Sequence, residues 1–294
     1  MTASADVRPP GNGETIESAP ADASAWMAWI GFAIVGVWIL VAMFAPAIAP
    51  YGVGEIVSRD SFARPGEVGL LGSDYLGRDV LSRLVHGARM TLGLALGAIA
   101  LAFVIGTLAA FIAALSRPWV DATLSRANEI MLSIPAIMLA LVVITALGTS
   151  IPVLVCTVGV IEATRVFRIA RAGALDVYAM EFVEISIARG ENKWWIMWRE
   201  ILPNVMPLLL TDLGTRFNLT ILLLASLSFI GLGIQPPSAD WGMMVRENLS
   251  GINFGAVATL APAFAIFSLN IALNLIVDWR LAQSNRDISE EMRR

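Results

Sequence analysis

The sequence predicts an all-α polytopic membrane protein with about six transmembrane helices, and two observations carry that prediction. Hydrophobic residues make up 57% of the 294 residues and charged residues only 15%, whereas ordinary globular chains are about 45–50% apolar and about 25% charged. Charge is also absent from five runs, each at least as long as the roughly 20 residues that cross a bilayer as a helix. They are residues 23–54, 90–116, 130–161, 217–239 and 248–277. This pattern excludes a soluble globular enzyme.

The N-terminal quarter of the chain begins with a polar tail. Residues 1–25 are rich in Ala, Ser, Pro, Gly and acid, and we expect them to form a disordered cytoplasmic tail. A first transmembrane helix is expected over 26–48, because Trp26 and Trp29 suit a membrane interface and Pro46 ends the run. The leader is acidic and the apolar run is long, so we expect a retained helix and not a cleaved signal peptide. Residues 49–87 are expected to be extracytoplasmic.

Residues 88–278 are expected to form a five-helix core, followed by a cytoplasmic tail over 279–294. A single helix over 127–164 would be about 57 Å long, against a hydrocarbon core of about 30 Å. Gly148 and Pro152 supply turn chemistry in that stretch, so we expect two helices there. The five core helices are predicted at 88–115, 124–147, 151–171, 205–232 and 255–278.

The distribution of Lys and Arg favours cytoplasmic N- and C-termini. Six of these residues fall within 165–199, which the six-helix arrangement places inside the cell. A five-helix arrangement with an external N-terminus satisfies the positive-inside rule better, but it requires one long helix across Gly148 and Pro152. We therefore expect six helices and a multi-pass protein of the bacterial plasma (inner) membrane.

Counts of rare residues exclude several kinds of site. The chain has one cysteine, Cys156, one histidine, His86, and one lysine, Lys193. An intramolecular disulfide is impossible, and a His and Cys metal site lacks ligands. The phosphate-binding loop G-x-x-x-x-G-K-[ST] is absent, and no basic run suggests nucleic acid. We expect no catalytic residue, metal or cofactor in this chain.

Residues 172–203 form the most informative polar segment. Trp194, Trp195 and Trp198 alternate there with charged residues, which favours short helices lying across the cytoplasmic face. Such tryptophans serve either as interfacial anchors or as a docking surface for another protein. The pattern alone leaves both alternatives open.

The same segment resembles the cytoplasmic loop of ABC importer permeases. That signature has a Glu, a Gly six residues later and Leu-Pro twelve and thirteen residues after the Gly. The matching positions are Glu184, Ala188, Gly190, Leu202 and Pro203, although Ile185 and Ser186 replace two alanines. The resemblance implies coupling helices that fit a cleft on an ATPase subunit, with Trp194 and Trp195 on the same surface. Gly190 would form the turn between the two helices.

Further stretches resemble the C-type permease subunits of the dipeptide, oligopeptide and nickel import family. Residues 71–83 read LGSDYLGRDVLSR, residues 201–204 read ILPN, and residues 228–242 read SFIGLGIQPPSADWG. The extracytoplasmic motif residues are Asp74, Gly77, Arg78, Asp79, Gln235, Pro236 and Trp241. Leu224 stands where family members often carry a Glu. For Asp74, Arg78 and Asp79, docking of a binding protein or gate closure competes with simple turn and cap chemistry.

The resemblance implies a type I ABC importer permease that forms half of a path for short peptides or related solutes. It also implies a second homologous permease, two ATP-binding subunits that hold ATP and Mg, and an extracytoplasmic solute-binding protein. The permease itself would catalyse no bond chemistry. The alternatives are a stand-alone secondary transporter or channel, for which we see no internal repeat, and an intramembrane enzyme, which would need convergent catalytic groups.

Polar residues inside the predicted helices are candidates for function, because intramembrane charge is rare and costly. Asp212 and Arg216 lie four residues apart and either line the path or form a structural pair. Asn218, Ser226 and Ser228 either face a peptide or bond to backbone. Glu129 and Glu162 either pair with Arg126 and Arg165 or lie at solvated helix ends, and the second alternative is favoured.

Overall fold

The computed structural model describes the backbone of residues 21–291 and the side chains of residues 26–283. These residues are almost entirely helical and carry only two isolated β-bridges. The all-α prediction is therefore confirmed for this part of the chain. Most of the predicted N-terminal tail lies outside the described residues.

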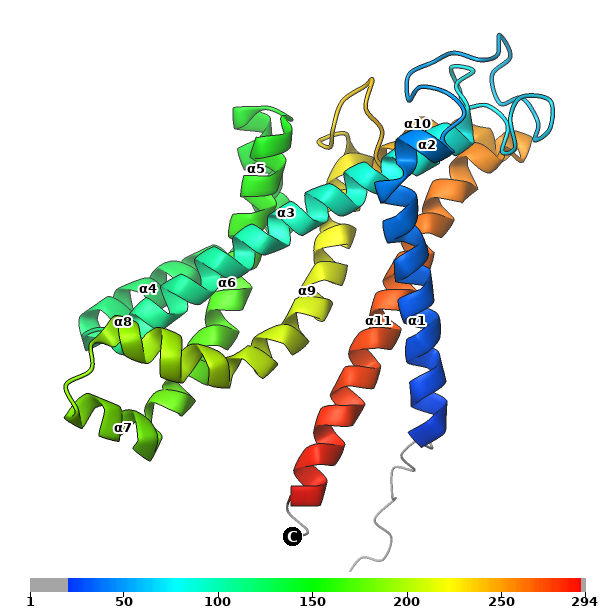
Figure 1. Cartoon of the computed structure of the whole chain (residues 1–294). Helices are drawn as coiled ribbons and strands as arrows, with labels where there is room; N and C mark the ends of the chain where they lie inside the picture. Colours follow the sequence, from blue (N-terminus) through cyan, green and yellow to red (C-terminus); the bar gives the residue numbers. More distant parts are fainter. Residues whose placement is uncertain (1–20, 292–294) are drawn as a thin grey trace, which may run out of the picture.

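The first and last helices pair along their lengths (Figure 1). Helix α1 spans Ala21–Met43 and α11 spans Val257–Glu291. Gly31 permits the close approach, because a Cβ there would lie 2.7 Å from the Ala272 carbonyl oxygen. The predicted bounds were wrong at both ends of the chain. The first helix starts at Ala21, inside the predicted tail, and the last helix continues through most of the predicted tail 279–294.

The chain breaks shortly after α1, where a helix over 26–48 was predicted. Helix α1 ends at Met43, and the single turn of α2, Ala45–Ile48, follows with Pro46 in it. Proline has no N–H to continue a preceding helix, which explains the break.

Helix α3, Val80–Leu115, begins earlier than predicted. Residues 80–87, which were predicted to belong to the extracytoplasmic segment, are part of this helix. Its start is set by Asp79, whose carboxylate accepts hydrogen bonds from the Ser82 N–H at 2.7 Å and the Ser82 hydroxyl at 2.6 Å. Helix α3 packs closely against α6, Ile151–Tyr178. A Cβ at Gly106 would lie 2.7 Å from the Ala163 carbonyl oxygen, so only glycine allows this contact.

The predicted single helix 124–147 is two helices, α4, Pro118–Ser133, and α5, Ala136–Leu147, which meet at an angle of 90°. Pro135 explains the bend, because proline pushes the preceding residue into extended conformation and ends a helix there. Ile134 indeed has a ψ of 129°. The predicted break after α5 is confirmed, since Gly148 turns the chain with a φ of +91° before α6 begins.

Residues 172–203 are more helical than predicted. Helix α6 extends to Tyr178, α7 covers Glu181–Ala188, and α8 covers Lys193–Ile196. The π turn η1, Met197–Ile201, joins α8 to α9, Leu202–Ile230, so that residues 193–230 form one continuous helical stretch. Helix α10, Trp241–Glu247, and the 3-10 turn η2, Leu249–Phe254, then lead to α11.

Four described stretches are long and apolar enough to cross a membrane: Trp26–Met43, Val80–Leu115, Lys193–Ile230 and Val257–Gln283. The bent pair of α4 and α5 would make a fifth if it counts as one span. Helix α6 is more charged and returns the chain from the Gly148 turn to α7. The described ends of α1 and α11 lie at the same end of the molecule as α7 and α8, and the 49–79 segment lies opposite with α10 (Figure 1).

Candidate functional site

Helix α7 is a short, exposed helix that ends in a glycine turn. Gly190 has a φ of +85°, a conformation that favours glycine. Its N–H donates to the Ile187 carbonyl at 2.9 Å, and the Glu191 N–H donates to the Ser186 carbonyl at 3.2 Å. These two bonds form a Schellman motif, which satisfies the last carbonyls of the helix. Gly190 thus makes the turn that was predicted for it.

Helix α8 begins immediately after that turn. The Asn192 side chain accepts a hydrogen bond from the Trp195 N–H at 2.8 Å and so caps the helix. The Trp194 side chain is 60% exposed. Trp195 is half-buried, with the Arg189 guanidinium 5.7 Å from its ring centroid. Together α7, α8 and η1, residues 181–201, form the α7–α8 segment.

An apolar cluster holds the α7–α8 segment against the ends of α3 and α6. Val183, Ile196 and Ile201 are buried in it. They pack with residues from the C-terminal halves of α3 and α6, which include Phe111, Leu115, Phe167 and Val177. Two polar contacts add to this packing. The Ser186 hydroxyl donates to the Glu200 carboxylate at 3.2 Å, and the Lys193 ammonium donates to the Leu115 carbonyl oxygen.

The predicted coupling residues divide into two groups in space. Glu184, Ala188 and Gly190 are exposed on or just after α7, next to exposed apolar side chains such as Ile185. Leu202 is half-buried against the apolar cluster, and Pro203 is exposed in the first turn of α9. The first group belongs to the exposed surface of the α7–α8 segment, and the second lies where this segment continues into α9.

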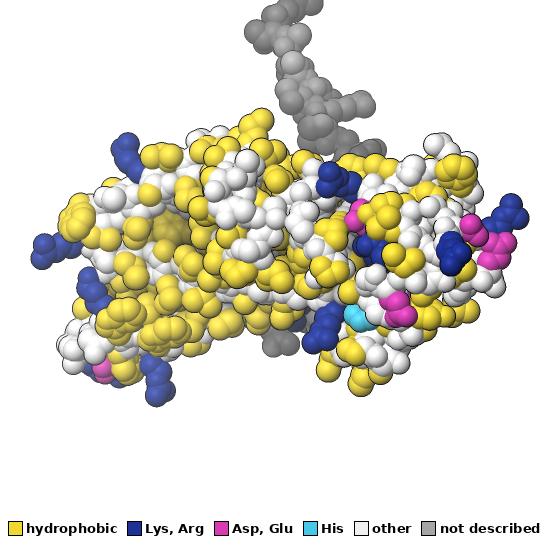
Figure 2. Space-filling model, turned by 90° about the horizontal axis from the view of Figure 1, so that it is seen from above, with side chains coloured by type: hydrophobic (Ala, Val, Ile, Leu, Met, Phe, Trp, Pro, Cys, Tyr) yellow, Lys and Arg dark blue, Asp and Glu magenta, His cyan; other side chains and the backbone are white. Residues whose placement is uncertain are grey.

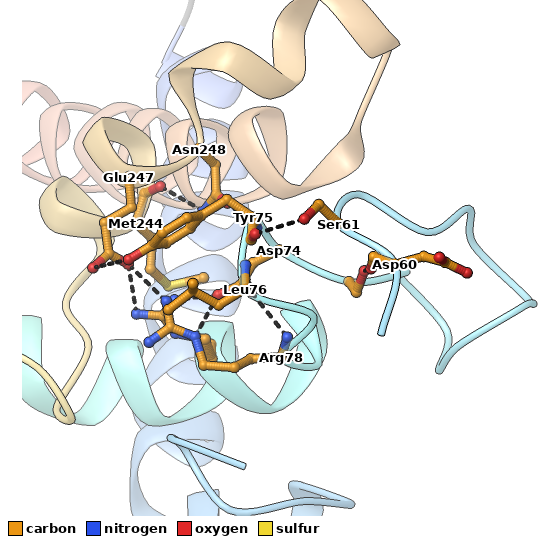
Figure 3. A network of polar contacts seen from close by, with 11 residues as sticks. Asp60, Ser61, Asp74, Tyr75, Leu76, Arg78, Met244, Glu247 and Asn248 are labelled. Atoms are coloured by element: carbon orange, nitrogen blue, oxygen red, sulfur yellow. Dashed lines mark hydrogen bonds and ion pairs between the residues drawn. The ribbon is translucent and has the colours of Figure 1, made fainter. Parts of the chain in front are cut away.

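The opposite end of the molecule carries a buried cluster of two acids and two arginines, the outer ion-pair cluster (Figure 3). The Asp74 carboxylate pairs with Arg78 at 2.7 Å and with Arg83, and it accepts the Arg78 backbone N–H at 2.9 Å. The Glu247 carboxylate pairs with the same two arginines, at 3.1 Å from Arg78 and 2.9 Å from Arg83. Arg83 is fully buried. The cluster joins the 49–79 segment and α3 to α10.

Other residues of the extracytoplasmic motif reinforce this joint. Gly77 has a φ of +76°, and a Cβ there would collide with the Ser58 carbonyl oxygen at 2.1 Å. The Trp241 indole N–H donates to the Leu84 carbonyl at 3.0 Å, and its ring meets Trp38 edge-on at a centroid distance of 4.7 Å. Gln235 and Pro236 are exposed in the loop after α9. In the view of Figure 2, most of the visible acidic side chains lie at the end of the molecule that carries this joint.

Sequence reasoning missed Glu247. Glu247 lies far along the chain from Asp74, Arg78 and Arg83. A single sequence gives no signal for such a contact, apart from the expectation that buried arginines find acids.

Pairs also form deeper in the helices. The Arg216 guanidinium donates to the Asp212 carboxylate at 3.1 Å and lies 3.9 Å from the Glu162 carboxylate across the α6–α9 contact. Glu162 also pairs with Arg165 and is buried, so the favoured solvated helix end was wrong for this residue. Arg126 and Glu129 are exposed and form no ion pair with described residues, in agreement with the favoured solvated helix end. The nearby Arg171 instead pairs with Asp121, which brings α6 against α4.

The predicted path residues are mostly occupied by contacts within the chain. The Asn218 amide donates to the Asn274 side chain on α11 at 2.8 Å, and Ser228 is buried. Ser226 is exposed, and its hydroxyl donates to the Leu222 carbonyl at 2.7 Å. It lines a groove of about 520 Å³ between α9, α10 and α11, together with Phe229, Phe267 and Asn270.

A bundle of long apolar helices with a surface of short helices at one end fits a transmembrane permease subunit. The chain belongs to the family described as "Binding-protein-dependent transport system inner membrane component", whose sequence profile matches residues 102–283. Family membership supports the permease prediction over a stand-alone transporter or channel.

Three curated relatives cover most of the chain. A glutathione transport system permease protein of Pectobacterium atrosepticum is 30% identical over 82% of this chain and 80% of its own length. A dipeptide transport system permease protein of Alkalihalophilus pseudofirmus is 30% identical over 86% and 83%. A di/tripeptide transport system permease protein of Pseudomonas aeruginosa is 31% identical over 82% and 81%.

A solved structure, of an amino acid ABC transporter, aligns with a TM-score of 0.52 at 18% identity and covers 68% of this chain and 96% of its own. This likeness concerns the fold, and it supports the predicted type I permease fold.

Removing Arg83 tests the outer ion-pair cluster. We expect Arg83→Met to destabilise the protein by about 3–5 kcal/mol, because two buried carboxylates lose a partner. The measurement is the thermal unfolding midpoint of the purified protein in detergent. Arg89→Met is the matched control, since Arg89 is exposed on the same helix. Equal midpoints for the two variants would contradict the assigned role.

Asp240 gives a pH-dependent prediction. Its buried carboxylate accepts the Met243 N–H at 3.1 Å and caps α10, and burial raises the pKa of this carboxyl above its usual value. Because the folded-state pKa lies above the unfolded-state pKa, ionised Asp240 lowers stability at neutral pH, and this loss disappears as the pH falls through the raised pKa.

Asp240→Asn keeps a good capping group without the charge. We therefore expect a higher unfolding midpoint than that of the unmodified protein at neutral pH, with a difference that shrinks in acid. Asp60→Asn, at an exposed position, should change neither value. A lower midpoint for Asp240→Asn at neutral pH would show that the charge is stabilising.

Proposed function

We propose that this chain forms half of the translocation path of an ATP-driven importer for short peptides or related solutes. The observation that carries this proposal is the α7–α8 segment, which exposes Trp194 and Ile185 to solvent yet is rooted in the apolar cluster below. An exposed apolar surface of this kind is typical of protein docking sites. The proposed partner is one of two ATPase subunits, which hold ATP and Mg²⁺.

The segment is well placed to transmit force. Helix α7 follows α6 after a two-residue turn, and α8 continues through η1 into α9. The Arg216 contact with Glu162 ties α6 to α9 farther along the same two helices. When the ATPases close on ATP, their movement is expected to shift the α7–α8 segment and bias the permease toward its outward-facing state. The permease itself contributes binding surfaces and no bond chemistry.

The proposed second permease covers the exposed apolar side of α4 and α5. Ile130, Met138 and Val142 are each at least 60% exposed there. The path would run between the two subunits, and a solute-binding protein would deliver the solute at the end that carries the 49–79 segment. We propose that both termini and the α7–α8 segment lie on the cytoplasmic side of a bacterial inner membrane.

The peptide assignment comes from the relatives, whose names refer to glutathione, dipeptides and di/tripeptides. These solutes share a short peptide backbone with charged ends. Polar groups of the groove between α9, α10 and α11, Ser226 and Asn270, are candidates for contact with it.

The test combines co-purification with a charge reversal in the complete transport complex. We expect the ATPase subunits to travel with the unmodified chain, and Glu184→Lys to reduce ATP-driven uptake of a labelled dipeptide at least tenfold. Gly190→Val should act in the same direction, because its backbone conformation disfavours a branched side chain. Asp278→Lys, an exposed charge reversal on α11 outside both proposed docking surfaces, is the control.

Two results would count against the proposal. One is the absence of any ATPase subunit from the purified material. The other is unchanged ATP-driven uptake in both the Glu184→Lys and the Gly190→Val proteins.

A further inference from the structure

The single lysine of the chain joins the α7–α8 segment to the end of α3. Lys193 is the first residue of α8, and its ammonium group donates to the Leu115 carbonyl oxygen in the last turn of α3. Carbonyls at a helix C-terminus lack partners within the helix, and the helix dipole favours a cation there. Apolar packing of Ile196 and Met197 near Leu115 surrounds this contact. The segment is therefore attached to α3 as well as to its chain neighbours α6 and α9.

The other end of α3 is attached just as closely to the outer face. Asp79 caps the helix, and Arg83, in its first turn, pairs with Asp74 and Glu247. One turn farther, a Cβ at Gly87 would lie 3.0 Å from the Trp241 ring, so the helix touches α10 directly. Helix α3 thus connects the outer ion-pair cluster with the α7–α8 segment.

Helix α3 is the stiffer of two routes between these ends. It is a single helix of 36 residues without proline, about 54 Å long. The route through α9 starts with a π turn and contains Pro203 and Pro207, which remove backbone hydrogen bonds. Figure 1 shows the early part of α9 curving away from its later course, whereas α3 crosses the molecule in one direction. A displacement is transmitted better by a continuous helix than by one that bends at prolines.

We infer that α3 carries the movement of the α7–α8 segment to the outer ion-pair cluster, with Lys193 as the positioning residue that attaches this segment to α3. The inference rests on the proposed function, because an ATPase must move the segment. A hydrogen-bonded cation at the end of a long helix is a discrete contact, and the same displacement reaches α10 through Arg83 and Glu247. If either contact is broken, nucleotide binding at the ATPase should no longer move the outer ion-pair cluster, while the ATPase stays bound to the permease.

The experiment measures movement at the outer end without any transported solute. Spin labels replace Leu76, which is exposed in the 49–79 segment, and Ser150, which is exposed in the turn before α6; Cys156→Ala removes the native thiol. The complex with its ATPase subunits is placed in nanodiscs, and the distance between the labels is measured before and after trapping with Mg-ATP and vanadate.

We expect trapping to change the distance distribution in the labelled protein. Lys193→Met, which loses the donor, should reduce that change at least twofold while ATPase subunits still co-purify. Lys193→Arg should restore the change, because Arg also donates to a carbonyl. Arg199→Met is the matched control, since Arg199 is an exposed cation of the same segment. If Lys193→Met fails to fold, Lys193→Leu is compared with Arg199→Leu in the same way.

A double substitution tests whether one route is shared. Combined with Glu247→Gln, Lys193→Met should lower the change no further than the stronger single variant, because both contacts lie along α3. A full change in Lys193→Met, no change in the labelled protein, or additive losses would each overturn the inference. Absence of the ATPase subunits from the labelled complex would instead mark failure of the proposed function.

Discussion

A charged side chain that is buried in this molecule needs a partner of opposite charge. The positions of these pairs determine which helices are held together. Arg83 is fully buried and meets Asp74 and Glu247, which joins α3, the 49–79 segment and α10. Glu162 meets Arg165 and lies near Arg216, which joins α6 to α9. The free energy of an unpaired buried charge is high, so these contacts restrict how the helices can move relative to one another.

Different interactions hold the two ends of the molecule together. At the outer end, ion pairs, caps and positive-φ glycines hold α3, α10 and the 49–79 segment together. At the other end, an apolar cluster supports a surface that still exposes Trp194. The first arrangement is directional and joins particular elements, whereas the second leaves apolar area for a partner. Under the proposed function, the apolar surface receives force from the ATPase and the ion-pair cluster responds to it.

Helical periodicity and proline explain where sequence-based bounds succeeded and where they did not. The break at Gly148 was predictable, because a single helix there would exceed the bilayer thickness. Pro135 bends α4 from α5 by 90°, and the prediction of one helix over 124–147 overlooked it. Helix α3 begins eight residues before its predicted start at residue 88, because the cap and a paired arginine allow a helix to begin in polar sequence.

The sequence by itself determined that this is a membrane protein, that Gly190 turns the chain between two short helices, and that its motifs match those of a permease. These properties depend on local composition and spacing, which a single chain displays directly. Only the tertiary structure decided that Glu247 completes the outer ion-pair cluster, that Lys193 reaches the end of α3, and that Asn218 is bonded to Asn274 and not free to face a path. Such pairs join residues far apart in the chain, and their contacts arise from how helices pack, which no local pattern encodes.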